Sequence, residues 1–197
     1  MVNDERFLVS GWEDDLHDID PSRNPEEGTE KMFLKAAEDG ELKTITDLVK
    51  INPALIQAID KDGYTPLHRA CYGNHLDIVK FLLENGADIS AKTAMQWEPL
   101  HSCCHWNNKE CAIALIQWGA DINSESEGGQ TPLHLCAAHG ADYDMAQILL
   151  MHPYIKPNKI SNTNDTPKDI AQRSSKFYNI FDIADPLLDI SNLDLLA

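Results

Sequence analysis

The chain of 197 residues lacks any apolar run close to the roughly 18 residues that a membrane-spanning helix needs. Its first five residues contain neither a basic stretch nor an apolar core, so we expect no secretory signal and a location in the cytoplasm or nucleus. Basic residues are also few, since 16 Lys and Arg stand against 32 Asp and Glu, which gives a net charge of −16. A surface of this sign repels phosphate groups. The composition therefore argues against direct binding to nucleic acid or to an anionic membrane.

Hydrophobic residues make up 43% of the chain, which is typical of a folded domain and argues against disorder throughout. The negative charge, however, is concentrated at the start. The first 30 residues contain ten acidic residues against Arg6 and Arg23, which is half of the net charge. A segment this acidic cannot bury enough apolar surface to offset the entropy of ordering it. We therefore expect residues 1–28 to form an acidic, largely disordered arm.

Two short motifs recur with the same period. A Thr-Pro-Leu-His motif at residues 65–68 returns at 98–101, with Glu98 in place of threonine, and again at 131–134, each time after 33 residues. A Gly-Ala-Asp-Ile motif at 86–89 returns at 119–122 after the same interval. A capping threonine followed by proline begins a helix, and glycine ends one. This fixed spacing predicts a solenoid of stacked helical repeats.

The motifs, together with small residues in each first helix and an apolar stripe in each second helix, resemble the ankyrin-repeat family from about residue 29 to 184. The resemblance implies an all-α ankyrin-repeat solenoid, in which helix-turn-helix repeats are joined by short β-hairpin loops. It also implies a protein that binds other proteins, and we expect a monomer in isolation. The first and last repeats are degenerate because one face of each meets water. The predicted repeats cover residues 29–60, 61–93, 94–126, 127–161 and 162–184.

The fourth repeat departs from this pattern. It contains one extra residue between its helices, at Ala141 and Asp142, and the expected Gly-Ala-Asp is replaced by Met151–Pro157, where two prolines prevent a continued helix. These irregularities, together with Tyr64–Ala70 and Trp97–Asn108, resemble one group of small ankyrin-repeat proteins. Members of that group are non-enzymatic and mostly nuclear, with a role in gene regulation, notably in male germ cells. The resemblance therefore implies a nuclear adaptor linked to regulation of gene expression, germ-cell differentiation and spermatogenesis.

The densest chemical cluster is His101–His105, with Cys111 and Cys136 expected nearby in the fold. Cysteine and histidine at this density are typical of zinc sites and catalytic thiols. The period favours a structural role instead, because all five cysteines fall at packing positions of the repeat. We expect the three motif histidines to tie neighbouring loops together by hydrogen bonds. No acid–base pair, phosphate-binding glycine loop or catalytic triad stands out, so we expect no cofactor, no metal and no catalytic residue.

In an ankyrin stack, the loop tips and the exposed side of each first helix form a concave face. Several aromatic residues and Arg69 are expected on this face in repeats two to four, and such residues dominate protein interfaces. The alternative is that Trp97 and Trp106 pack between adjacent loops and helices. We favour the binding of a protein partner, because grouped exposed aromatic residues mark contact surfaces. The predicted protein-binding residues are Tyr64, Arg69, Tyr72, Met95, Trp97, Ser102, His105, Trp106, Gln130, Leu135 and His139.

Both ends of the chain carry apolar residues within acidic sequence. Phe7–Trp12 in the arm is a short anchor for a partner or for the first repeat. Residues 185–197 form an acidic, leucine-rich tail whose Leu187, Ile190, Leu193 and Leu195 have the spacing of a nuclear export signal, which an amphipathic turn packed on the last repeat also has. The sequence leaves both pairs of alternatives open.

The leading functional hypothesis is a non-enzymatic adaptor that holds another protein on the concave face. The alternative is an inhibitor or assembly chaperone whose acidic arm masks a basic partner protein. A zinc- or thiol-dependent enzyme is the remaining hypothesis, and it rests on the cysteine and histidine cluster alone.

Overall fold

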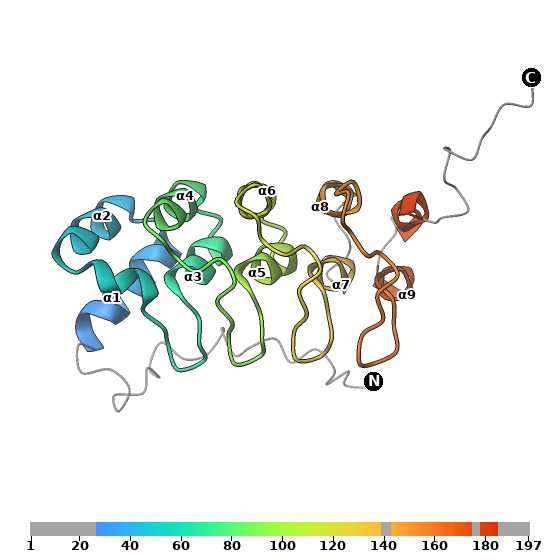
Figure 1. Cartoon of the computed structure of the whole chain (residues 1–197), viewed down its shortest axis with the longest axis horizontal. Coiled ribbons are helices and arrows are strands. Elements are labelled where there is room, and N and C mark those ends of the chain that lie inside the picture. The colour runs from blue at the N-terminus through green and yellow to red at the C-terminus, as the bar shows by residue number, and fades with distance from the viewer. Residues whose placement is uncertain (1–26, 139–142, 175–177, 185–197) are drawn as a thin grey trace, which may run out of the picture.

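A computed structural model describes residues 27–138, 143–174 and 178–184 of the chain. Within these residues the helices form five consecutive pairs, repeats one to five, which stack side by side in one row (Figure 1). The first helix of each pair packs on the first helix of the next pair, and the second helices form a second, parallel row. The inner row consists of α1 (Glu27–Asp39), α3 (Pro66–Tyr72), α5 (Pro99–His105), α7 (Pro132–Ala138) and α9 (Pro167–Ser174). The outer row consists of α2 (Leu42–Ile51), which the 3-10 helix η1 (Pro53–Gln57) follows, α4 (Leu76–Glu84), α6 (Lys109–Gln117), α8 (Tyr143–Leu150) and the 3-10 helix η2 (Tyr178–Ala184).

The helices of repeat two show how the motif produces a helix pair. Thr65 precedes α3 in an extended conformation, its hydroxyl accepts a hydrogen bond from the backbone N–H of His68, and Pro66 fills the first helical position, where no N–H is needed. In α4 the buried side chains are Ile78, Val79, Leu82 and Leu83, which form one apolar stripe facing the inner row. Gly86 ends the pair with a φ of +85°, a conformation that glycine adopts without strain.

The loops between repeats are tight hairpins held by one pattern of hydrogen bonds. The backbone N–H of Asp60 donates to the carbonyl of Tyr64, with 3.1 Å between nitrogen and oxygen. The equivalent bond from Thr93 to Trp97 measures 3.0 Å. Adjacent hairpins are joined by a bond from Ala94 N to the Asp62 carbonyl at 2.7 Å. None of the described loop residues forms a β-strand, because each hairpin closes after a single such bond. The β-hairpin loops of the prediction are therefore turns.

A continuous apolar core runs between the two rows from Phe33 in α1 to Phe181 in η2. This arrangement confirms the predicted all-α ankyrin-repeat solenoid. None of the helices in the described part of the chain combines the length and apolarity that a bilayer crossing requires. The acidic arm up to residue 26, the extra residue at Ala141–Asp142 and the leucine-rich tail lie outside the described residues.

The remodelled loop of repeat four is held by one asparagine. Helix α8 ends at Leu150, before the first of the two prolines, as the sequence predicts. The side-chain amide of Asn123 donates to the carbonyl of Tyr154 at 2.8 Å, and its oxygen accepts from the N–H of Lys156 at 2.8 Å. Asn123 thus fixes both sides of the loop against the preceding repeat.

Candidate protein-binding site

The three motif histidines join each inner helix to the next hairpin. The Nδ1 atom of His68 accepts from the backbone N–H of Thr65 at 3.2 Å, and its Nε2 lies 3.0 Å from the carbonyl of Trp97. His101 and His134 make the same pair of contacts one and two repeats later. An Nδ1 that accepts leaves the proton on Nε2, so each ring is neutral and donates across the repeat boundary. These bonds confirm the predicted role of the motif histidines.

Burial favours the neutral form of these rings. It lowers the pKa of His68 and of His101 from 6.5 to about 4, and it lowers the pKa of His134 as well. The hydrogen bonds from Nε2 to the backbone carbonyls of Trp97 and Gln130 act in the opposite direction and do not outweigh burial. The three histidines therefore stay neutral near neutral pH and serve as structural hydrogen-bond donors.

The five cysteines are free and buried in the core, as the period predicts. Loss of solvent raises the pKa of the Cys103 and Cys104 thiols well above the usual value, and it raises the pKa of Cys111 too. A thiol that stays protonated is a poor nucleophile and a poor metal ligand. Among the described residues, no group of three or more His, Cys, Asp or Glu side chains is placed to hold a metal ion.

Glu98 occupies the helix-cap position that threonine has in repeats two and four. Its backbone keeps the extended cap conformation, and its N–H donates to Nδ1 of His101 at 3.1 Å. Glu98 is only 6% exposed, and burial raises the pKa of its carboxyl group, an effect that the Lys92 ammonium at 4.0 Å partly offsets. The cap of α5 is therefore preserved through the backbone and the histidine.

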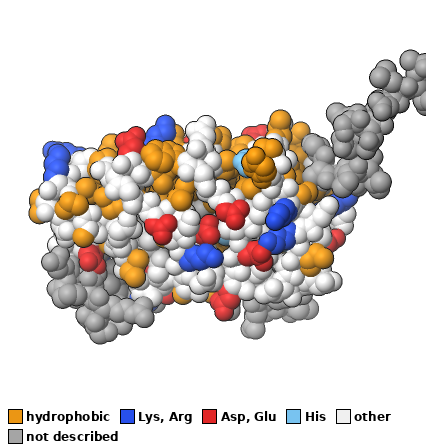
Figure 2. Space-filling view, viewed as in Figure 1, with side chains coloured by type: hydrophobic (Ala, Val, Ile, Leu, Met, Phe, Trp, Pro, Cys, Tyr) orange, Lys and Arg blue, Asp and Glu red, His pale blue; other side chains and the backbone are white. Residues whose placement is uncertain are grey.

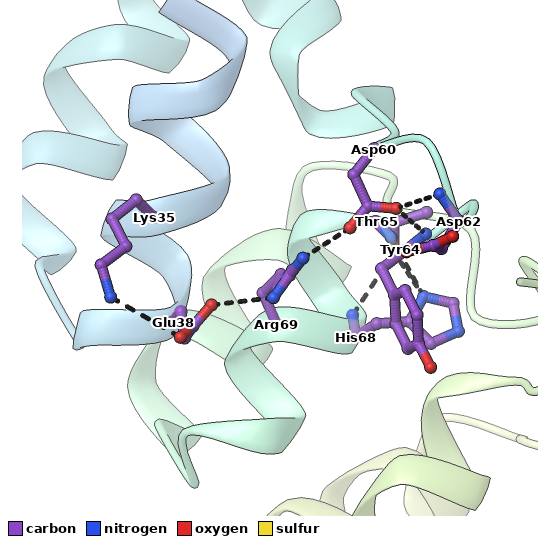
Figure 3. A network of polar contacts seen from close by, with 8 residues as sticks. All are labelled: Lys35, Glu38, Asp60, Asp62, Tyr64, Thr65, His68 and Arg69. Carbon is purple, nitrogen blue, oxygen red and sulfur yellow. Dashed lines mark hydrogen bonds and ion pairs between the residues drawn. The ribbon is translucent and has the colours of Figure 1, made fainter. Parts of the chain in front are cut away.

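Arg69 is the centre of a polar network that joins repeats one and two (Figure 3). Its guanidinium contacts Glu38 on α1 at 2.9 Å and Asp60 in the first hairpin at 2.6 Å. Glu38 also lies 3.6 Å from Lys35, and the guanidinium carbon lies 5.6 Å from the centre of the Tyr64 ring. The Asp60 side chain is 4% exposed, so the Arg69 charge compensates a buried carboxylate. Arg69 is accordingly engaged within the fold.

Four of the predicted binding residues are buried, which corrects the prediction that they are exposed. Tyr64, Ser102 and Leu135 are 2 to 3% exposed, and His105 is 6% exposed. Tyr64 packs edge-on against His68 with ring centres 5.6 Å apart. Ser102 and Leu135 lie on α5 and α7, inner helices that pack directly on their neighbours in the row. His105 lies between two tryptophan rings.

The other predicted residues reach the surface to different degrees. Met95, at a hairpin tip, is 42% exposed, and Trp106 is 36% exposed. Tyr72, Trp97, Gln130 and Arg69 are partly buried. His139 lies outside the described residues.

Four aromatic side chains from repeats two and three form a connected cluster, which we call the aromatic cluster: Tyr72, Trp97, His105 and Trp106. The Tyr72 and Trp106 rings meet edge to face, with centres 5.0 Å apart and an angle of 89°. His105 contacts Trp106 at 4.8 Å and Trp97 at 5.1 Å. Both alternatives for the tryptophans thus apply in part, since Trp97 packs against the His101 and His105 rings while Trp106 stays open to solvent.

Trp106 lies on what we call the turn edge, the side of the stack where each inner helix ends and the turn to its outer helix begins. Asn108 fixes this turn, because its side-chain amide donates to the carbonyls of Cys71 and Tyr72 at 2.7 and 2.9 Å. The indole of Trp106 is therefore held at a defined position by the preceding repeat. A side chain ordered before binding loses little entropy when a partner arrives.

The sequence analysis did not single out a second group of exposed apolar residues. Trp118 is 49% exposed at the end of α6, and Met151 and Tyr154 are 71% and 77% exposed after α8. Figure 2 shows hydrophobic side chains gathered along the side where the outer helices lie. The period contained a signal for two of them, because Trp118 takes the position of Asn85 and, once the extra residue of repeat four is counted, Met151 takes the position of Glu84, and both of these positions are polar in repeat two.

Comparison with known proteins agrees with the repeats seen in the fold. The family model described as "Ankyrin repeats (3 copies)" matches residues 7–93, 32–126 and 91–161. The chain is 46% identical over 184 residues to ankyrin repeat domain-containing protein 49 of Drosophila melanogaster, covering 93% of this chain and 86% of that protein. It is 52% identical over 160 residues to the Homo sapiens protein of the same name, covering 81% and 67% of the two chains. The Drosophila match is longer than residues 29–197, so it includes part of the acidic arm.

Shorter matches reach proteins with other names. Palmitoyltransferase akr1 of Schizosaccharomyces pombe is 43% identical over 60 residues, which is 30% of this chain and 9% of that protein. So short a match extends over about two repeats, and repeats of this kind occur in proteins of unrelated function. This match therefore reflects the shared repeat alone and gives no indication of enzymatic activity.

Proposed function

Because the chain belongs to the ankyrin-repeat family, we propose that it is a non-enzymatic, monomeric adaptor that binds another protein through repeats two to four. The contact surface has Trp106 at its centre and extends through His105 to Trp97, with Met95 at the hairpin tip at its far end. The observation that carries this proposal is the exposed indole of Trp106, which Tyr72, His105 and the Asn108 turn hold in place. Tryptophan is one of the residue types enriched at the hot spots of protein interfaces.

The proposal also includes a nuclear location and a role in regulating gene expression during germ-cell differentiation. The resemblance of Trp97–Asn108 and Met151–Pro157 to one group of nuclear ankyrin-repeat proteins supports this part. Fluorescence microscopy of the tagged full-length chain tests the compartment, and exclusion from the nucleus contradicts it.

A second candidate function is the masking of a basic protein by the acidic arm. It is favoured by the concentration of half the net charge in the first 30 residues and by the Drosophila match that reaches into the arm. In this case binding depends on the arm, and the aromatic cluster contributes nothing.

Two tryptophans make a matched pair for the test. Trp106→Ala removes the proposed anchor, and Trp118→Ala removes an equally large and more exposed indole on the outer row. We expect Trp106→Ala to remove specific partners from an affinity purification quantified by mass spectrometry, while Trp118→Ala keeps them. Trp97 is a poorer probe, because its ring packs on His101 and His105 and its loss also affects the fold.

The controls separate folding from binding. Thermal unfolding followed by circular dichroism should give midpoints within about 4 °C of the wild type for both tryptophan variants, because losing a side chain that is over a third exposed should cost less than about 1 kcal/mol. Deletion of residues 1–26 leaves α1, which begins at Glu27, intact and tests the arm. Equal capture by wild type and Trp106→Ala contradicts the adaptor proposal, and loss of capture only on deletion of the arm supports masking.

A further inference from the structure

The turn edge carries the exposed indole and two acidic residues from the outer helices that follow the turns. Asp77 lies in the first turn of α4, and Glu110 lies in the first turn of α6, one period later. Both side chains are exposed. Asp77 follows the turn after Tyr72, and Glu110 follows the turn after Trp106. Both carboxylates act electrostatically on the Cys111 thiol, which places them in the same part of the stack, after the two aromatic residues. Acidic groups at these positions also stabilise the helix N-termini, which leaves their solvent-facing oxygens available.

Among the described residues, no ring lies flat on the indole of Trp106. Tyr72 meets it at 89° and His105 at 76°, so both neighbours make edge contacts and neither stacks on it. An indole of this kind, 36% exposed, can accept a planar group. The guanidinium of arginine is planar and cationic, and it stacks on tryptophan more favourably than the compact ammonium of lysine does.

The cation nearest in sequence to Trp106 is directed elsewhere. Lys109 begins α6, and its ammonium pairs with Asp144 of repeat four at 2.9 Å. The ion pair leaves Glu110 as the next exposed charge in the same turn. The turn edge beside Trp106 is therefore complementary to positive charge, and the net charge of −16 steers cationic partners toward the whole molecule.

We propose that the turn edge of repeats two and three binds a basic, arginine-containing segment of a partner protein, with one guanidinium stacked on Trp106 and neighbouring cationic side chains paired with Asp77 and Glu110. This inference rests on the proposed function and adds the chemistry of the partner. It differs from masking by the acidic arm, because the specificity for arginine resides in the folded stack.

Binding of simple labelled peptides to the purified full-length chain tests the proposal. The probes are twelve-residue peptides of alternating Gly and Arg, of Gly and Lys, and of Gly and Glu, followed by fluorescence anisotropy at low and at physiological salt. We expect the arginine peptide to bind about fivefold more tightly than the lysine peptide, and the glutamate peptide not to bind. Trp106→Ala should abolish the preference for arginine, whereas Trp118→Ala should keep it.

The carboxylates and the arm have their own variants. Asp77→Asn with Glu110→Gln should weaken both cationic peptides about threefold to tenfold and reduce the salt dependence, because exposed ion pairs are screened by salt. Deletion of residues 1–26 should lower overall affinity but preserve the arginine-to-lysine ratio. Circular dichroism confirms that each variant is folded.

Three outcomes overturn the inference: equal affinity for arginine and lysine peptides, equal losses in Trp106→Ala and Trp118→Ala, or loss of all peptide binding on deletion of the arm. If cellular partners still depend on Trp106 while the peptides do not, the adaptor function stands and only the basic character of the partner is wrong. If neither depends on Trp106, both proposals fail.

Discussion

The histidine junctions and the turn edge follow the same period of 33 residues, yet they differ in how their contacts repeat. His68 and His101 make the same two hydrogen bonds in consecutive repeats. On the turn edge, the residues one period apart are Gly73 and Trp106. A Cβ atom on Gly73 would lie 2.4 Å from the carbonyl oxygen of Glu38 and 2.5 Å from the ring of His75.

The difference between Gly73 and Trp106 goes with a difference at the residue two positions later, which is His75 in repeat two and Asn108 in repeat three. In repeat two, His75 donates from Nε2 to the carbonyl of Glu38 at 2.8 Å, and its ring lies over Gly73. In repeat three the smaller Asn108 makes the equivalent contact, and Trp106 stands two positions before it, where repeat two has Gly73. The junctions are constrained in every repeat because they satisfy buried backbone groups. The turn edge meets the same requirement with different side chains, so the surface there varies without loss of the stack.

The largest expected effect tests whether the junctions act alike. His68 and His101 have a pKa of about 4 in the folded chain against 6.5 when exposed, so between these values the unfolded chain binds protons that the folded chain does not. Stability is therefore full above pH 6.5 and falls as the pH drops toward 4. We expect a loss of about 2 kcal/mol per histidine at pH 5 relative to pH 7.

Urea unfolding at both pH values measures this loss. The carboxyl of Glu98 acts in the opposite direction, because its raised pKa lets the folded chain take up a proton first as the pH falls. In His101→Asn the pH-dependent part of the loss should shrink by about a third to a half, because His68 and His134 still contribute, even though the variant is less stable at every pH. A free energy of unfolding that is constant between pH 7 and 5 contradicts the neutral, buried junctions.

The second prediction tests the turn edge. Gly73→Ala should lower the free energy of unfolding by about 2 kcal/mol, because the added methyl group meets the backbone oxygen of Glu38, which cannot rotate away. Trp106→Ala, one period later, should change it by less than about 1 kcal/mol, because that side chain is over a third exposed. Thermal or urea unfolding of the two variants gives the comparison directly. Equal losses would mean that the two turns have the same packing after all.

Much of this comparison could be predicted from the sequence. The period placed the cysteines in the core and assigned the histidines to the loops, because these roles depend on position within the repeat. The burial of Ser102, His105 and Leu135 could not be predicted in this way, since it depends on which side chains of the neighbouring repeats lie over them. The pairing of Arg69 with Glu38 also lay beyond reach, because the two residues belong to different repeats and only the stack brings them together.

The smallest predicted effect concerns the tips of the hairpins. Gly63 and Gly129 have φ values of +82° and +67°, and the equivalent residue in repeat three is Gln96, with a φ of +59°. A residue with a side chain is strained in this region, whereas glycine is not. Gln96→Gly should therefore raise the free energy of unfolding by about 0.5 kcal/mol, since relief of strain slightly exceeds the added freedom of the unfolded chain.

Asn164 is the matched control for this prediction. It occupies the same turn position in the last described hairpin with a φ of +62°, and asparagine tolerates the left-handed region better than glutamine does. Asn164→Gly should accordingly stabilise the chain less than Gln96→Gly in the same urea titration. If Gln96→Gly instead lowers stability, the glutamine contributes contacts that outweigh its strain. The hairpin tip beside Met95 would then be as constrained as the histidine junctions, and the variable part of the stack would be confined to the turn edge.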